Sequence, residues 1–483
     1  MVGSICGPAQ PARDRVLTSA LIRGNEAARA GQLDAARLHY AQALLEQPAM
    51  AEVVFGNLLR LSRQAPPSAS PLRVTVAGFE LGHNAAGRVQ VLADVHARSG
   101  SVVDIVGPVL LPYREVWPPL RDAAVPRRVF SLASPGAILA HLLPLVAAQR
   151  ADVVHLSKAR GPNLLTAALY KLWWNSTVVL DVDDEELGFV GARDPLPLPQ
   201  WQSLPAEARS LQQLYGREWT QLAVGMVSAF DGVTVANAAL QQRYGGEVLR
   251  HARDERELVP SLQRGAAARA RFGVPAAARV VLFFGTPRAH KGLLDVARAL
   301  ASIEGDRWRL VIVGDFEDQA FRRDLLAVRP GLVQCLPGQP FAAIPDVLSI
   351  ADVCVVLHQE QAVASRLQTP AKLTDALAMG VPVLASASPG VREFVEWDAV
   401  CVTTPETLAT DLVALCEAND AEHCRAGLIE RGRKAFLEHL SFASQSARLQ
   451  QIVTAARARA LSGAPVLSWP PVEVLRWVLR GIA

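Results

Sequence analysis

The sequence predicts an α/β protein with two doubly wound parallel-sheet domains, preceded by a small all-α segment. Short apolar runs alternate with helical patterns from about residue 72, as expected for parallel strands joined by crossover helices. A second set of the same kind opens at residue 279, so two sheets in tandem are expected. At 483 residues the chain is also too long for one hydrophobic core.

Residues 1–64 are expected to form the helical segment. Small and aromatic residues there follow the spacing of one tetratricopeptide repeat, at Gly24, Ala27, Gly31, Ala36, Tyr40, Ala43 and Pro48. Small residues let two antiparallel helices pack closely, and residues 51–64 resemble the first helix of a further repeat. Because about three repeats are normally needed to bury a core, this segment must pack on the rest of the chain, on a second copy or on a partner protein. A packing role and a recruiting role both stay open.

Residues 65–71, APPSASP, are a Pro/Ser linker that leads into the first sheet domain. This N-terminal Rossmann-like domain spans residues 72–255. Its strands are expected at 72–78, 101–107, 127–132, 152–157, 176–184 and 232–236. A glycine-containing turn at 82–88 follows the first strand, and the next helix ends at Gly100.

The second Rossmann-like domain spans residues 256–455. Its strands are expected at 279–285, 308–315, 332–338, 352–358, 381–386 and 399–403. Two such domains create a cleft, where small ligands tend to bind. Residues 456–483 are expected to form a helix that crosses back to the N-terminal domain. Because residues 468–483 are amphipathic, peripheral contact with a membrane surface is the alternative.

Composition excludes several classes of protein. The net charge of +3 is nearly balanced and no dense basic stripe occurs, so we expect no nucleic-acid partner. No apolar run reaches the ~18 residues that a membrane span needs, and no signal peptide is recognisable. The six cysteines include no C-x-x-C pair, which favours reduced thiols and a cytoplasmic protein, at most peripheral to the inner face of a membrane.

Two lysines mark candidate phosphate sites. The chain has five lysines against forty-four arginines, and Lys291 and Lys372 each follow an apolar β-type run and a polar turn at the start of a helix. Helix N-termini offer free backbone N–H groups and the positive end of the macrodipole to phosphate. Two such sites, 81 residues apart, predict a pocket for a nucleoside diphosphate.

The second half of the chain resembles the donor domain of a GT-B-fold, family-4 (group 1) glycosyltransferase. Four landmarks occur in the family's order: G-x-x-R-x-x-K-G at 285–292, VIVGD at 311–315, LPG at 336–338 and P-x-K-L-x-D-A-L-A-x-G-V-P-V-L-A-S at 370–386. The first half is similar more weakly, through its glycine loop, DVVH (152–155), LDVDD (180–184) and RHARDE (250–255). The resemblance covers about residues 72–455 and implies two Rossmann-like domains facing a cleft.

The resemblance implies a metal-independent enzyme without a cofactor, of hexosyltransferase type. Such an enzyme moves a sugar from a nucleotide-diphosphate sugar to a glycan, lipid-linked glycan or protein acceptor, with retention of configuration. Arg288 and Lys291 would stabilise the leaving diphosphate, because fixed cations absorb the charge that develops there. His155, at a strand end, is a further candidate for a catalytic or sugar-contacting group, and a histidine bonded within the core is the alternative.

Donor binding is expected from the glycine turns, the cations and the start of the helix near residue 370. The full donor-binding set is Gly285, Arg288, Lys291, Gly314, Leu336, Gly338, Thr369, Pro370, Ala371, Lys372 and Asp375. Thr369 suits the N-cap and Pro370 the first helical position. The resemblance assigns the ribose hydroxyls to Asp375, although Lys372 and Asp375 could instead form an ordinary helical ion pair. Acceptor contacts are expected at His83, Gly87 and Arg88.

The chain also departs from the family pattern. Many members carry two glutamates eight residues apart, where this chain has Leu367 and Asp375, so no acid at the first position can touch the sugar. Asp181, Asp183 and Asp184 form a D-x-D-D cluster, which in GT-A enzymes binds a divalent metal, but that reading leaves residues 280–386 unexplained. Two other functions stay open: a degenerate GT-B protein acting as a repeat-bearing binding module, and a sugar-nucleotide epimerase.

Overall fold

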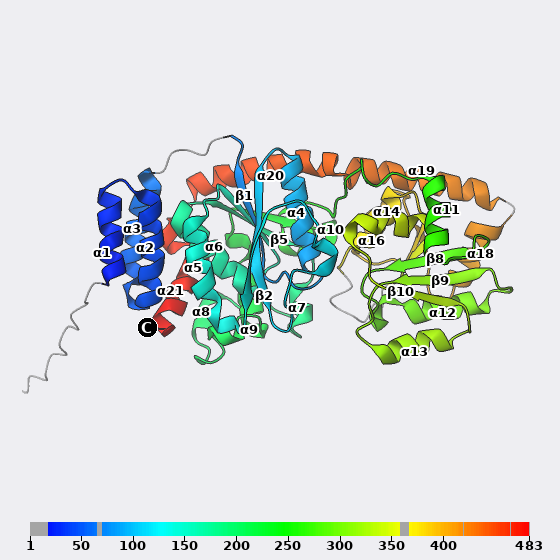
Figure 1. Cartoon of the computed structure of the whole chain (residues 1–483), viewed down its shortest axis with the longest axis horizontal. Coiled ribbons are helices and arrows are strands. Elements are labelled where there is room, and N and C mark those ends of the chain that lie inside the picture. The colour runs from blue at the N-terminus through cyan, green and yellow to red at the C-terminus, as the bar shows by residue number, and fades with distance from the viewer. Residues whose placement is uncertain (1–17, 65–69, 358–366, 419, 464, 483) are drawn as a thin grey trace, which may run out of the picture.

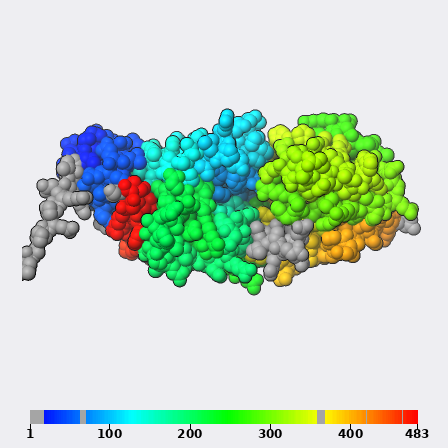
Figure 2. All heavy atoms as spheres, turned by 90° about the horizontal axis from the view of Figure 1, so that it is seen from below, coloured from blue at the N-terminus to red at the C-terminus, as the bar shows by residue number. Residues whose placement is uncertain are grey.

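The computed structural model describes residues 18–64, 70–357, 367–418, 420–463 and 465–482 (Figure 1). Along the long axis of the molecule a helical segment comes first, then the N-terminal sheet domain, then the C-terminal sheet domain (Figures 1 and 2). The two parallel sheets confirm the α/β class expected from the alternating pattern.

The helical segment consists of α1 (Ser19–Arg29), α2 (Leu33–Glu46) and α3 (Ala51–Gln64). Gly24 lies so close to the neighbouring helix that a Cβ atom there would be 2.6 Å from the Tyr40 ring. Tyr40 is buried between the helices, and its hydroxyl donates to Asn25 Oδ1 at 3.0 Å. The small and aromatic positions therefore act as the sequence predicts, while membership in the tetratricopeptide family stays a prediction.

This segment packs on the N-terminal domain of the same chain. Helix α2 contacts α5 (Ile138–Ala148), and α3 contacts α6 (Gly161–Trp174). Arg37 on α2 donates through Nε to the Trp173 carbonyl at 3.2 Å, and its guanidinium lies 4.1 Å from the centre of the Trp174 ring. The buried apolar side chains of α1–α3 thus belong to one core with those of α5 and α6.

The N-terminal domain is built on a seven-stranded parallel sheet in the order β3-β2-β1-β4-β5-β6-β7. All six expected strands are present, and the short β7 is an addition. The strands are β1 (Arg73–Gly78), β2 (Val102–Leu110), β3 (Arg127–Leu132), β4 (Val153–Ser157), β5 (Thr177–Val182), β6 (Gly232–Val235) and β7 (Glu247–Val248). Besides α5 and α6, its helices are α4 (Ala86–Arg98), α7 (Glu186–Phe189), α8 (Leu198–Gln202), α9 (Arg217–Gly225) and α10 (Ala238–Tyr244).

The C-terminal domain is built on a six-stranded parallel sheet in the order β10-β9-β8-β11-β12-β13. Its strands are β8 (Arg279–Phe284), β9 (Trp308–Val313), β10 (Val333–Leu336), β11 (Val353–Val356), β12 (Val383–Ala385) and β13 (Cys401–Val402), as expected. Its helices are α11 (Leu262–Arg271), α12 (Leu293–Ser302), α13 (Gln319–Ala327), α14 (Ile344–Ser349), α16 (Ala371–Ala378), α17 (Arg392–Glu396), α18 (Leu408–Glu417) and α19 (Ala421–His439). In both sheets the order reverses beside the first strand, which places a switch point at the carboxyl end of β1 and of β8.

The chain crosses between the domains twice, and the two crossings bond to each other. The Arg253 amide donates to the Leu440 carbonyl at 3.0 Å, and the Phe442 amide donates to the Arg253 carbonyl at 2.9 Å. Helix α20 (Phe442–Ser462) then packs on α4 and β5. The return to the N-terminal domain therefore begins at residue 442, earlier than the expected boundary at 456.

The last helix, α21 (Pro470–Ile482), lies between the helical segment and the N-terminal domain (Figure 2). Its apolar face, which includes Val472, Leu475 and Leu479, is buried against the core that α6 shares with the helical segment. In this packing the helix lies against the N-terminal domain, and the core covers the apolar face that the membrane alternative would need. Within the described ranges, no helix is both long enough and apolar enough to span a bilayer.

Candidate active site

The predicted donor residues gather at the carboxyl ends of β8, β9 and β10 and at the start of α16. The two glycine turns pack tightly: Gly314 has φ +154°, and a Cβ atom there would be 2.1 Å from the Gly285 carbonyl oxygen. Gly338 donates its amide to Asp315 Oδ1 at 3.1 Å, and a Cβ atom there would lie 2.7 Å from Oδ2 of the same residue. These glycines are therefore required by the packing of the turns, with Leu336 half-buried at the end of β10.

Four cationic or basic side chains meet at this edge of the sheet: Arg288, His290, Lys291 and Lys372. Burial and then the charges of the other three lower the pKa of His290 to about 4. Burial lowers the pKa of Lys372 well below its usual value, and the nearby Lys291 adds to the shift. The Lys372 ammonium lies over the Phe283 ring, 3.6 Å from its centre. The repulsion among these groups makes the edge a candidate anion site.

Lys291 and Arg288 have few bonded partners among the residues that the structure describes. The Lys291 ammonium donates to Gln368 Oε1 at 3.2 Å, and burial lowers its pKa, with Arg288 adding to the shift and Asp184 opposing it. Arg288 is exposed and makes one long ion pair with Glu317, at 3.4 Å. Both side chains therefore retain N–H groups for an incoming anion.

Helix α16 begins one residue later than expected. Its N-cap is Pro370, which offers no side-chain hydrogen bond, and Ala371 is its first residue. The Thr369 hydroxyl does not cap the helix, because it donates to the Gly390 carbonyl at 2.6 Å and accepts from Asn237 Nδ2 at 2.9 Å. The first amides of α16 are consequently without a side-chain cap, beside the Lys372 ammonium.

Asp375 is not open to a ribose in this structure. It is 2% exposed, and its carboxylate forms an ion pair with Arg253, 2.5 Å between Oδ1 and Nε. Burial raises the pKa of this carboxyl, and the Arg253 charge opposes the shift. The expectation of a ribose-binding Asp375 is therefore wrong for this conformation, and so is the alternative of an ion pair with Lys372, because Arg253 occupies the carboxylate.

His155 lies in the core and not at the edge of the sheet. It is fully buried in β4, where it bonds to His96 Nε2 at 3.0 Å and to the Thr234 hydroxyl at 3.0 Å. Thr234 donates its own proton to Asp181 Oδ1 at 2.7 Å, so His155 Nε2 must donate to Thr234. Burial, followed by Arg88, lowers the pKa of His155 to about 3, and the imidazole is neutral. The prediction of a catalytic His155 is wrong because strand β4 continues for two residues beyond it.

The predicted acceptor loop is only partly a loop. Helix α4 begins at Ala86, so Gly87 and Arg88 belong to its first turn. Arg88 is buried and grips Asp181 through two hydrogen bonds of 2.9 and 2.7 Å, and it also donates to two backbone carbonyls. These four hydrogen bonds occupy the Arg88 guanidinium, so the expectation that Arg88 contacts an acceptor is wrong.

His83 lies in the turn before α4, on the side that faces the donor cations. Its ring contacts Phe79 and Tyr113, with centroids 6.0 and 5.5 Å away. Burial lowers the pKa of His83, and the charges of Lys158, Arg160 and Arg288 add to the shift. Arg288 belongs to the other domain, so a charge of the C-terminal domain acts on this side chain of the N-terminal domain.

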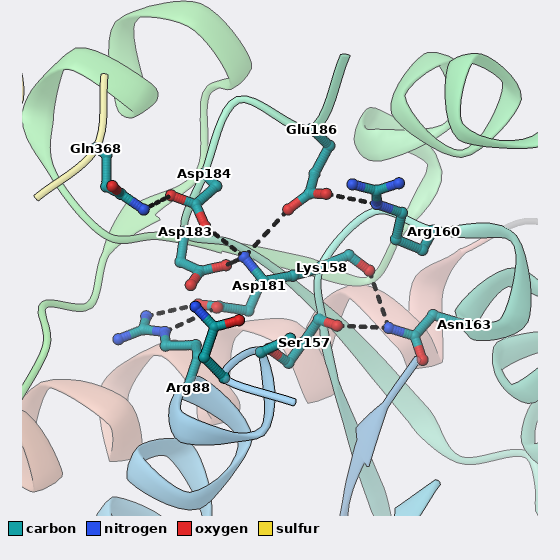
Figure 3. Close-up of polar contacts among 12 residues, drawn as sticks. Arg88, Ser157, Lys158, Arg160, Asn163, Asp181, Asp183, Asp184, Glu186 and Gln368 are labelled. Atoms are coloured by element: carbon teal, nitrogen blue, oxygen red, sulfur yellow. Dashed lines mark hydrogen bonds and ion pairs between the residues drawn. The ribbon is translucent and has the colours of Figure 1, made fainter. Parts of the chain in front are cut away.

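Two carboxylates of the D-x-D-D cluster, with a third from Glu186, hold a lysine where a metal ion would lie (Figure 3). Asp183, Asp184 and Glu186 bring their oxygens together, and the Lys158 ammonium lies 2.7, 2.6 and 3.2 Å from one oxygen of each. Lys158 is 6% exposed, and these contacts raise its pKa well above the usual value despite its burial. Since the ammonium occupies the centre of the carboxylates, they are a poor fit to a divalent cation in this arrangement.

Sequence reasoning missed three residues that organise the interface: Lys158, Gln368 and Arg253. The scarcity of lysine could have singled out Lys158, which is one of five in the chain. Gln368 lies two residues before the recognised 370–386 motif, and Arg253 lies within RHARDE, but neither carries a local signal of its partner.

Comparison with known proteins agrees with this architecture. Residues 278–418 match the family model described as Glycosyl transferases group 1. The structure is similar to Anabaena HepE in complex with UDP-glucose, with a TM-score of 0.60 and 16% identity over 80% of this chain and 100% of that one. It is also similar to sucrose-phosphate synthase from Thermosynechococcus elongatus, with a TM-score of 0.58 and 17% identity over 80% and 99% of the two chains.

A third similar structure is the catalytic domain of Arabidopsis thaliana starch synthase IV bound to ADP and acarbose, with a TM-score of 0.57 and 12% identity over 81% and 100% of the two chains. No curated protein matches the sequence. At these identities the structures establish the GT-B fold, and the family match over the C-terminal domain supports the expectation of a glycosyltransferase.

Proposed function

We propose that this chain is a metal-independent, retaining glycosyltransferase that moves a hexosyl group from a nucleotide-diphosphate sugar to a glycan, lipid-linked glycan or protein acceptor. The observation that carries the proposal is the group of repelling cations at the carboxyl edge of the C-terminal sheet. Lys291, Lys372 and Arg288 meet there beside the uncapped start of α16. A diphosphate would remove the repulsion among them and bond to the free amides.

The chemistry needs such a site because the diphosphate gains negative charge as the sugar–phosphate bond breaks. Arg288 and Lys291 would stabilise this charge, each with N–H groups still free, and Lys372 would add a second ammonium. The proposal gives no role in the reaction to His155 and Asp375, because each is held by a buried partner. On the N-terminal side, we assign His83 to the acceptor, because the charge of Arg288 acts on this side chain.

The proposal is tested by thermal unfolding with UDP, GDP, ADP and their common sugar conjugates, each with Mg²⁺ or with EDTA. A ligand at a hundred times its Kd stabilises the folded state by about 2.7 kcal/mol, so one diphosphate should raise Tm clearly. We expect Lys291→Ala to weaken that diphosphate by about tenfold or more, because a charge-assisted contact is lost. Lys434→Ala is the matched control, since that lysine is 72% exposed on α19.

The outcomes separate the alternatives. Stabilisation that requires Mg²⁺ would contradict the metal-independent mechanism, and no stabilisation by any of the three diphosphates would overturn the proposal. Binding without sugar transfer to any acceptor class would favour the binding module. Conversion of the donor sugar in the absence of an acceptor would favour the epimerase.

A further inference from the structure

The side chain of Gln368 connects the two domains at the candidate donor site. Its amide nitrogen donates to Asp184 Oδ1 of the N-terminal domain at 2.8 Å, and its amide oxygen accepts from the Lys291 ammonium at 3.2 Å. The two partners fix the orientation of the amide, because a carboxylate can only accept and an ammonium can only donate. Among the described residues, Lys291 therefore donates one of its three N–H groups to a side chain, and two remain for an anion.

Asp184 is itself rigidly held on the N-terminal side (Figure 3). Its other oxygen, Oδ2, accepts from Lys158 at 2.6 Å, and only 8% of the residue is exposed. Lys158 has a left-handed backbone, with φ +79°, which is uncommon for a residue other than glycine. Asn163 Nδ2 fixes this turn by donating to the carbonyls of Ser157 and Lys158 at 2.6 and 2.9 Å. A strained turn that is held by such contacts is typical of functional positions.

A second residue of the N-terminal domain, Asn237, bonds to the residues on both sides of Gln368. Asn237 Nδ2 donates to the Leu367 carbonyl at 2.8 Å and to the Thr369 hydroxyl at 2.9 Å. Asn237 is 1% exposed, and its Oδ1 caps α10 by accepting from the Leu240 amide at 2.9 Å. Both the backbone and the side chain of the 367–369 segment are thus positioned by the neighbouring domain.

We propose that Asp184 is a positioning residue for Lys291 and acts through Gln368, so that the N-terminal domain aligns a phosphate-binding lysine of the C-terminal domain. This inference rests on the proposed function, which assigns the diphosphate to Lys291. Without the Gln368 carbonyl, Arg288 and Lys372 would repel the Lys291 ammonium from this position. The carboxylates of the D-x-D-D cluster would attract it. The arrangement makes diphosphate binding depend on contact between the domains.

The substitution Asp184→Asn discriminates well because it should reverse the Gln368 amide. If the new side-chain oxygen faces Lys158, the new NH₂ group faces Gln368, which must then turn its own NH₂ group toward the Lys291 ammonium. We expect Asp184→Asn to weaken binding of the diphosphate by about tenfold, similar to the loss of one hydrogen bond to a charged group. Gln368→Met, which keeps the length of the side chain but removes its polar atoms, should have the same effect.

The test is a double-substitution cycle on the full chain, with Kd for UDP, GDP and ADP measured by calorimetry. If Asp184 acts only through Gln368, the variant with both substitutions binds no more weakly than Gln368→Met alone. Asp183→Asn is the matched control: Asp183 bonds to the same Lys158 ammonium at 2.7 Å but not to Gln368, so its affinity should stay within about twofold of the wild type.

Each result decides the inference. Wild-type affinity in Asp184→Asn, or losses that multiply in the doubly substituted chain, would overturn it while the proposed function stands. If Asp183→Asn weakens diphosphate binding as much as Asp184→Asn does, the inference would also be overturned, because the whole cluster would then be merely structural. Far-UV circular dichroism and Tm identify any variant that has lost its fold, in which case Gln368→Met, at the domain surface, still decides the question. If wild type binds none of the three diphosphates, the proposed function itself fails.

Discussion

At the scale of single residues, buried partners decide which titratable groups take part in chemistry. His155, His96 and His251 are all neutral in the folded protein, since burial lowers the pKa of each. By contrast, Lys291 and Lys372 remain at the edge of the sheet and lack a bonded carboxylate among the described residues. The buried histidines therefore belong to the structural core, whereas the two lysines belong to the candidate site.

The histidine core makes stability depend on pH in a defined direction. The pKa of His155 is about 3 when folded, against about 6.5 when unfolded, so the unfolded chain binds the proton first. The contribution is complete above pH ~6.5 and falls by about 1.4 kcal/mol for each pH unit as the pH drops toward 3. We expect His155→Gln to lower the slope of the unfolding free energy against pH by one proton over this range, measured by urea unfolding.

The control for the substitution itself is His423→Gln, on the exposed surface of α19 and outside the buried histidines. An unchanged slope in His155→Gln would contradict the neutral, buried assignment. Diphosphate binding by His155→Gln at neutral pH should equal that of the wild type, because the residue is in the core and does not face the site.

At the scale of elements, the helical segment is an integral part of the N-terminal domain. Arg37 is the polar anchor of α2: its side chain is 3% exposed, bonded to the Trp173 carbonyl and stacked on Trp174. A second polar contact involves the last helix: Arg476 of α21 forms an ion pair with Glu52 of α3 at 2.6 Å. The core of the segment is continuous with that of the domain, so the two should unfold together.

Arg37→Ala tests this docking. The variant loses the hydrogen bond and the cation–π contact, and we expect the free energy of unfolding to fall by about 2 kcal/mol in a single urea transition. Arg60→Ala, at an exposed position on α3, should change it by less than about 0.5 kcal/mol. A separate early transition in the wild type would show that the segment is an independent module.

Local pattern was sufficient to predict the strands but not the partners of charged residues. The runs 279–285 and 308–315 became β8 and β9 because buried parallel strands need near-continuous apolar residues, which are visible in any short window. The pairing of Asp375 with Arg253 joins residues 122 positions apart, and His155 meets Thr234 across 79 positions. Such contacts depend on how the domains and strands assemble, so the cationic turn could be predicted and the partners of Asp375 and His155 could not.

At the scale of the whole molecule, the double crossing between the domains is also where a buried charge pair lies. Arg253 comes from the first crossing, and Asp375 belongs to α16, whose first turn carries Lys372. The Arg253 guanidinium also lies 4.9 Å from the centre of the Phe341 ring in the C-terminal domain. The crossing segment is thereby anchored on α16, whose first turn is part of the candidate donor site. Movement of the crossing segment should therefore displace α16.

The final prediction uses the unequal chemistry of this pair. Asp375→Asn leaves the Arg253 guanidinium buried without a counter-charge, and since Arg remains protonated we expect a loss of about 3 kcal/mol or more of unfolding free energy. Arg253→Met should cost less at pH 5.5 than at pH 8, because the pKa of Asp375 is already raised by burial and its carboxyl can take up a proton. The combined variant Arg253→Met/Asp375→Leu should regain most of the loss, as apolar replacements of buried pairs do.

Urea unfolding of the four proteins at both pH values measures these differences. Equal losses for the two single variants at pH 5.5 would contradict the assignment. If the combined variant recovers stability but binds diphosphate more weakly, the pair serves to position α16 relative to the crossing segment, and its role is positioning rather than stability.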